Sequence, residues 1–216
     1  MSLPLREALA HVLWLGGSAC AGKTSAARAL AAAHGLTLYS CDDWFEDHRR
    51  RAVPASHPHF HRLMDLPVEE LWRQPPARQA RDLLLFYEDE LAMVVEDLRR
   101  LPGPVLAEGV GLLPSRIADA LSTPRQACWL IATPQFRRRH QPRREAWPAG
   151  PLGRCRDPER AFAGWMARDD EVARQLAAQA AARSLRCRVI DGSSSERQTV
   201  AALARHFRLA SAPVLS

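Results

Sequence analysis

Lysine is nearly absent from this chain of 216 residues, although basic residues are abundant. Of the 30 lysines and arginines, Lys23 is the single lysine, and arginine occupies every other position of this group. A GC-rich genome would account for the arginine bias and for the many alanines, but not for the one lysine that is kept. The surroundings of Lys23 are therefore the first place to look for a functional site.

Long apolar runs and a cysteine framework are also missing. No uninterrupted apolar stretch approaches the roughly 18–20 residues of a membrane span, and the N-terminus has no signal-peptide pattern, so we expect a cytoplasmic protein without a membrane partner. The five cysteines are odd in number and form no C-x-x-C pair, which predicts neither a disulfide framework nor a zinc site. Nothing in the sequence specifies an oligomeric state.

The net charge of +6 predicts anionic partners, which could be nucleotide phosphates, a phosphorylated metabolite or nucleic acid. The single lysine belongs to a segment that fits the pattern G-x-x-x-x-G-K-[ST], in which backbone N–H groups surround phosphates, lysine contacts the outer phosphates and the hydroxyl binds Mg²⁺. An arginine would replace this lysine poorly, because its planar guanidinium is wider and more rigid than an ammonium group. ATP and Mg²⁺ are therefore the predicted cofactors. The segment consists of Gly17, Ser18, Ala19, Cys20, Ala21, Gly22, Lys23 and Thr24.

The context of this segment is a strand, a glycine-rich loop and a helix, in that order. Residues 11–15 form a short apolar run typical of a strand, and residues 24–34 are rich in strong helix formers. The helix should end at Gly35, a residue type that favours the left-handed conformation after a helix. Its N-terminus adds a partial positive charge to the phosphate site.

Carboxylates follow two further predicted strands. Residues 36–40 form an apolar strand that leads to Asp42 and Asp43, and residues 105–109 form another that delivers Glu108. Ligands of open parallel sheets bind at the carboxyl ends of the strands, so these side chains should face the same crevice as the phosphate loop. The alternative for either aspartate is a capping role at the start of the next helix.

The rest of the chain predicts one α/β domain over residues 1–216 with a parallel sheet. Its core covers about residues 11–44 and 102–208, and a substrate-covering insertion covers about 45–101, because this connection is too long for a simple crossover. Within the insertion, prolines and alternating histidines predict an irregular loop over 45–75, solvent-facing or substrate-lining rather than metal-binding. The other expected elements are helix 77–101, strand 126–132, helix 157–184, strand 185–190 and helix 196–208.

Over about residues 11–208, the phosphate loop, the paired aspartates and the order of elements resemble the P-loop small-molecule and nucleoside monophosphate kinases. This group includes adenylate, shikimate and gluconate kinases and chloramphenicol phosphotransferase. The resemblance implies a P-loop NTPase three-layer sandwich whose parallel sheet has the order 2-3-1-4-5, with an acceptor-binding insertion after the second strand and an arginine-bearing lid. It also implies that the loop containing Gly192 and Ser193 packs on adenine, although a plain turn with a helix cap is the alternative.

Phosphoryl transfer explains why these residue types occur together, because the reaction needs charge neutralisation and in-line positioning. We assign Lys23 to the β- and γ-phosphates and Thr24 to Mg²⁺. One of Asp42 and Asp43 would accept the proton of an acceptor hydroxyl or hold that hydroxyl, while the other orders the water around Mg²⁺. Asp43 and Glu108 are the candidate metal-site carboxylates, and Glu108 could share either role.

The lid is expected at about residues 137–157, after the fourth strand. Arg137 and Arg144 are its candidate catalytic arginines, with Arg160 and Arg168 as alternatives from the following helix. A solvated basic face is the structural alternative for each of them.

The predicted function is ATP-dependent phosphorylation of a small hydroxylated acceptor, such as a metabolite, a nucleoside or an antibiotic. The paired aspartates resemble the hydroxyl-phosphorylating members of the group more than the adenylate kinases. A 5′-hydroxyl polynucleotide kinase is one alternative and predicts salt-dependent oligonucleotide binding, although few aromatic residues interleave with the arginines. A non-catalytic ATP-binding regulatory protein is the other alternative.

Overall fold

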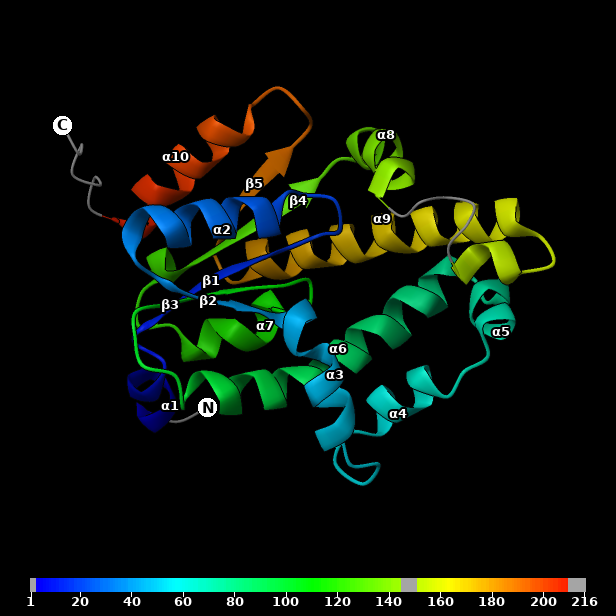
Figure 1. The fold of residues 1–216 in the computed structure, drawn as a ribbon, viewed down its shortest axis with the longest axis horizontal. Coiled ribbons are helices and arrows are strands. Elements are labelled where there is room, and N and C mark those ends of the chain that lie inside the picture. Colours follow the sequence, from blue (N-terminus) through cyan, green and yellow to red (C-terminus); the bar gives the residue numbers. More distant parts are fainter. Residues whose placement is uncertain (1–2, 145–150, 210–216) are drawn as a thin grey trace.

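The sheet at the centre of the molecule is parallel throughout. A computed structural model describes residues 3–144 and 151–209 (Figure 1). Its strands lie in the order β2-β3-β1-β4-β5, and every neighbouring pair is parallel. This arrangement confirms the predicted α/β class, the parallel sheet and its order. The strands are β1 (Val12–Gly17), β2 (Thr37–Ser40), β3 (Val105–Glu108), β4 (Ala127–Ala132) and β5 (Arg186–Ile190).

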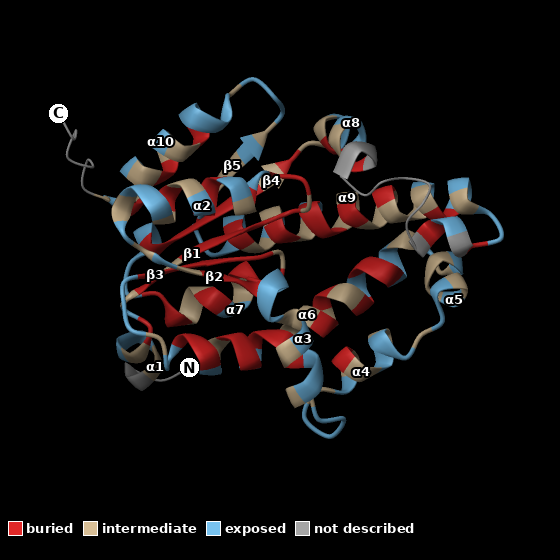
Figure 2. Cartoon of the chain, in the orientation of Figure 1, coloured by how far each residue is buried: buried red, intermediate tan, exposed pale blue. Residues whose placement is uncertain are grey.

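Helices cover both faces of this sheet, which is why the inner strands read as continuous apolar runs. Alternate residues of β1 point to opposite faces. Val12 and Trp14 pack into one buried cluster together with residues of α6 (Pro76–Leu98) and α7 (Pro114–Ile117). Leu15 belongs to a second cluster, which is completed by α2 (Lys23–His34) and α10 (Glu196–Phe207). Figure 2 shows the inner strands mostly in the colour of buried residues, with buried segments on the helices that flank them.

The segment after β2 is helical, contrary to the irregular loop expected over residues 45–75. It contains α3 (Cys41–Arg51), α4 (Pro58–Met64) and α5 (Val68–Arg73) before α6 begins. Four of the five prolines that suggested breaks lie at helix starts: Pro58 and Pro76 are in the first turn, and Pro67 and Pro75 are N-caps. Pro54 lies in the turn between α3 and α4. Proline is tolerated at helix starts because the first N–H groups of a helix have no intrahelical acceptor.

The remaining helices are α1 (Leu3–Ala8), α8 (Pro134–Arg144) and α9 (Pro158–Ala182). Asp157 is the N-cap of α9, and its side chain accepts a hydrogen bond of 3.0 Å from the Arg160 N–H. Part of the expected lid, residues 145–150, lies outside the described residues. None of the helices in the described part of the chain is both long and apolar enough to cross a membrane.

Candidate functional site

The segment 17–24, here called the glycine loop, joins β1 to α2 with the backbone geometry that its glycines permit. Gly17 has a φ of 130°, and a Cβ atom there would lie 1.9 Å from the carbonyl oxygen of Leu130. Gly22 has a φ of 76°, and a Cβ atom there would meet nothing within 4 Å. Position 17 therefore has no room for a side chain against β4, whereas the space beside Gly22 is open.

Hydrogen bonds to β4 fix the start of the glycine loop. The Ser18 N–H donates to the Leu130 carbonyl at 2.9 Å, and the Ser18 hydroxyl accepts from the Ala132 N–H at 2.9 Å. Lys23 curls back over the loop and donates from Nζ to the Ser18 carbonyl at 2.8 Å. With 7% of its surface exposed, Lys23 keeps its charge within the loop rather than in bulk solvent. A loop that leads into the N-terminus of a helix and encloses one ammonium suits an anion.

Glu108 brings three elements together beside the loop. The carboxylate is 1% exposed, and its Oε1 accepts hydrogen bonds from the Thr24 hydroxyl at 3.1 Å and from the Ser40 hydroxyl at 2.8 Å. Hydroxyl and carboxylate oxygens are the ligands that Mg²⁺ prefers. Among the described residues, no group of three or more His, Cys, Asp and Glu could hold a metal by itself. The donor set therefore fits a metal that takes most of its ligands from phosphates and water.

Asp42 and Asp43 lie in the first turn of α3, directly after β2. Both side chains are exposed and line a cleft of about 800 Å³ that also contains the glycine loop and Glu108. Ser40, not either aspartate, is the N-cap of α3, so the alternative capping role for the aspartates is not observed. The cleft thus joins all the predicted acidic residues to the predicted phosphate site.

The wall formed by α8 and α10 carries an aromatic pair that the sequence interpretation missed. Phe136 and His140 stack with ring centroids 4.0 Å apart and an interplanar angle of 22°, and both line the cleft. Gly192 packs behind them, since a Cβ atom there would lie 3.4 Å from the Phe136 ring. Ser193 donates to Asp191 through both its N–H and its hydroxyl, and Ser194 lines the cleft. The i, i+4 spacing of the two rings after β4 was the available signal.

The candidate lid arginines occupy very different environments. Arg137 is 0% exposed; it pairs with Asp170 and donates to the Ala132 carbonyl at 3.1 Å, so it joins α8 to α9 and to the end of β4. The expectation that Arg137 belongs to a mobile lid does not match this burial. Arg144 is the last residue of α8, and its side chain lies outside the described residues. Arg160 is exposed.

Arg168 is the α9 arginine that lines the cleft. Its Nε and Nη2 donate to Asp169 Oδ1 at 2.9 and 2.8 Å, and its guanidinium carbon lies 4.9 Å from the Trp72 ring centroid. Trp165 contributes a second ring, at 5.9 Å. Arg168 is therefore a positioned cation on the wall of the cleft, held by a carboxylate and by cation–π contacts.

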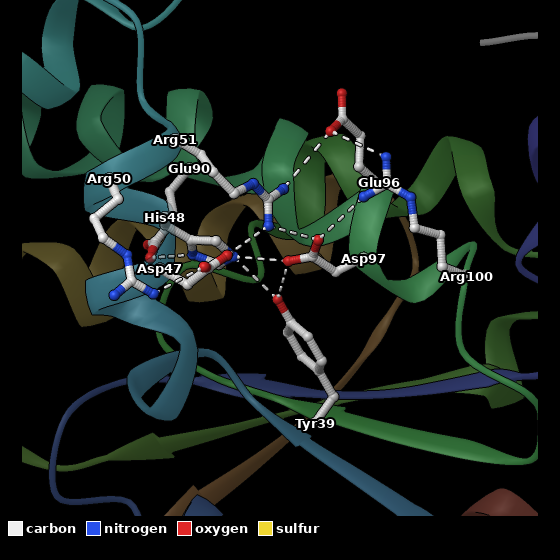
Figure 3. Close-up of polar contacts among 9 residues, drawn as sticks. All are labelled: Tyr39, Asp47, His48, Arg50, Arg51, Glu90, Glu96, Asp97 and Arg100. Atoms are coloured by element: carbon white, nitrogen blue, oxygen red, sulfur yellow. Dashed lines mark hydrogen bonds and ion pairs between the residues drawn. The ribbon is translucent and has the colours of Figure 1, made fainter.

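A buried polar cluster holds α3, the helix that carries Asp42 and Asp43, against α6. His48 is 0% exposed, with Nδ1 3.0 Å from Glu90 Oε1 and Nε2 3.0 Å from Asp97 Oδ2 (Figure 3). The Tyr39 hydroxyl donates to the same Asp97 oxygen at 3.0 Å, and Arg51 donates to the other oxygen at 2.7 Å. We call these five residues the His48 cluster. They fix the position of α3 through contacts with α6 and with Tyr39 of β2.

Comparisons with known proteins provide no family for this chain. No family model matches it, and no curated protein does. The function must therefore be inferred from the residues of the cleft.

Proposed function

We propose that this protein is an ATP-dependent phosphotransferase that moves the γ-phosphate to a hydroxyl group of a small acceptor. One observation carries the proposal: a buried lysine within a glycine loop shares a single cleft with Glu108, Asp42 and Asp43. A plain anion-binding loop would not need carboxylates beside it. Phosphoryl transfer needs both an anion-binding loop and carboxylates, because the phosphates require cations and the acceptor hydroxyl requires a proton acceptor.

The nucleotide would lie across the glycine loop. Lys23 and the N–H groups at the start of α2 would bind the β- and γ-phosphates, and Phe136 and His140 would stack on the base. Thr24 and Glu108 would hold Mg²⁺, which supplies neutralisation of the charge on the β- and γ-phosphates. The Thr24 hydroxyl donates to Glu108 in the structure, so its oxygen lone pairs are directed away from that carboxylate and are available to a cation.

In the transfer step, the acceptor oxygen forms a bond to the γ-phosphorus while the bond from that phosphorus to the bridging oxygen of ADP breaks. The hydroxyl proton passes to Asp42 or Asp43, both of which are exposed to the cleft at the end of β2. Arg168 lines the same cleft and would offset charge on the transferred group. ADP and the phosphorylated alcohol are the products.

The test is a screen of hydroxylated metabolites, nucleosides and nucleotides for acceptor-stimulated ADP release, with a 5′-hydroxyl oligonucleotide on the same plate. Asp42→Asn or Asp43→Asn should reduce turnover by at least about 10²-fold while leaving ATP binding nearly unchanged, since a general base contributes about 10²–10⁴-fold. Full activity in both variants would contradict the assignment of the base. Tight ATP binding without ADP release for any acceptor would favour a regulatory protein, and phosphorylation of the oligonucleotide alone would favour a polynucleotide kinase.

A further inference from the structure

We infer that the acceptor is an uncharged or cationic alcohol that carries an apolar ring, bound between α6 and α9. The inference rests on the proposed function, because it concerns the part of the cleft that lies beyond the glycine loop and faces Asp42 and Asp43. It excludes acceptors that carry a phosphate or a carboxylate. Nucleoside monophosphates and sugar acids are therefore not the substrates of this site.

Five apolar or aromatic side chains line this part of the cleft. Leu83 and Tyr87 come from α6, Trp165 and Val172 come from α9, and Val110 follows β3. Leu83, Tyr87 and Val110 are only partly buried, although each packs against a buried apolar cluster. Apolar side chains in the wall of a cleft favour a ligand that offers apolar surface of its own. A ring can cover these side chains, whereas a fully hydrated anion cannot.

The charges of the same region favour a neutral or positive ligand. Asp42, Asp43 and Asp169 bring three carboxylates to the cleft. Among the described lining residues of α3, α6 and α9, Arg168 is the one cation, against these three carboxylates. The other arginine of the described lining, Arg28, belongs to α2 beside the glycine loop. A phosphate on the acceptor would meet more repulsion than attraction here.

Two polar groups in this wall suit a second hydroxyl or an amino group on the ligand. The Tyr87 hydroxyl makes no hydrogen bond to another described residue, and burial raises the pKa of Tyr87, which therefore stays a donor. Arg168 lowers this pKa, whereas the carboxylates of Glu90, Asp42 and Asp169 raise it. Asp169 is 5% exposed, and its Oδ2 accepts no hydrogen bond within the described structure. A buried acceptor without a donor is costly unless a ligand or water supplies one.

Binding of matched ligand pairs tests this inference without requiring turnover. Ligand-observed NMR would be recorded with the full chain and Mg·ADP present. The neutral or cationic probes are thymidine, 1-phenyl-1,2-ethanediol and 2-amino-1-phenylethanol; their anionic counterparts are thymidine 5′-monophosphate and mandelate, and glycerol is the probe without a ring. We expect at least one ring-bearing alcohol to bind about tenfold more tightly than its anionic counterpart and than glycerol.

The chain contains two tyrosines, and they provide a matched pair of variants. Tyr87→Phe should weaken binding of the ring-bearing alcohol by about fivefold to tenfold, the effect of one hydrogen bond. Tyr39→Phe removes a hydroxyl that donates to Asp97 at 3.0 Å and does not line the cleft, so it should weaken this binding less than Tyr87→Phe does. Circular dichroism verifies that both variants are folded.

Two results would overturn the inference: anionic probes that bind as tightly as their neutral counterparts, or no binding by any ring-bearing alcohol at millimolar concentration. A different result separates it from the kinase proposal. If ring-bearing alcohols bind as expected but Mg·ATP is not consumed in their presence, the phosphotransferase proposal fails and the ligand class of the cleft stands.

Discussion

Replacing His48 with glutamine should destabilise the protein by about 3 kcal/mol. The ring has no exposed surface and lies between two carboxylates, each 3.0 Å from a ring nitrogen. The two carboxylates favour the protonated imidazole, which can donate to acceptors at both nitrogens. Removing one partner of a buried ion pair costs about 3–5 kcal/mol. Glutamine retains an amide donor, and Asp97 retains Arg51 at 2.7 Å, so we expect the lower end of this range.

The pH dependence of this loss follows from the pKa of His48. Burial lowers this pKa, but hydrogen bonds and charges from Glu90 and Asp97 raise it by more, so the folded-state value lies above the ordinary 6.5. A raised pKa means that the folded state binds the proton more tightly than the unfolded state. The stabilisation is therefore fully present below about pH 6.5 and is lost as the pH rises through the folded-state pKa. The variant should differ most from the original chain at acidic pH.

Urea unfolding followed by circular dichroism at pH 6 and pH 9 would measure both effects. A loss of about 3 kcal/mol corresponds to a melting temperature lower by roughly 6–12 °C. Adding Glu90→Gln to the variant should recover part of the loss, because a buried unpaired carboxylate is then removed. His34→Gln, at the end of α2, is the control and should cost less than about 1 kcal/mol. A loss below about 1 kcal/mol at pH 6, or equal losses at both pH values, would refute a charged His48.

Two further predictions concern the glycine loop. Lys23→Arg should keep the fold, as judged by circular dichroism, but lower the rate of ADP release by roughly 10²–10³-fold, the usual effect of removing one stabilising donor from a transition state; near-normal turnover would mean that the lysine has no special role. Gly17→Ala should cost several kcal/mol in urea unfolding, because its Cβ would lie 1.9 Å from the Leu130 carbonyl. The matched Gly22→Ala should cost only about 1–2 kcal/mol in urea unfolding. Its Cβ would meet no other atom, so the left-handed backbone conformation is the only source of strain.

The elements that the sequence predicted well are those whose signals are local. The apolar runs of β1, β3 and β4 are buried on both faces, and the helix that follows the glycine loop ends at Gly35 in the left-handed conformation. The helices α4 and α5 were missed because proline has two opposite meanings. It breaks a helix from within but starts one at the first turn, and only the position of each proline relative to the helix decides between them.

The site divides in the same way. The meeting of the glycine loop, Asp42, Asp43 and Glu108 in one cleft was predictable, because each lies at or just after the end of a strand and parallel strands bring their carboxyl ends to one edge. The aromatic pair of Phe136 and His140 was not predicted, and the preference for Arg137 over Arg168 pointed to a buried side chain. Sequence spacing does not say which side chains of two distant helices meet. The neighbours of each side chain in α8 and α9 decide this.

Several arginines of the chain lie in surroundings that suit a guanidinium better than an ammonium. Arg137, Arg51 and Arg168 are each held by a carboxylate, and Arg168 also by two aromatic rings. Guanidinium groups suit such fixed positions, because a planar fork pairs with carboxylates and stacks on rings. Lys23 occupies the opposite kind of position: it is enclosed by its own loop and donates to the Ser18 carbonyl. Only a compact ammonium can exchange that carbonyl for a phosphate oxygen without displacing the loop, which is the physical reason to expect that arginine fails at this one position.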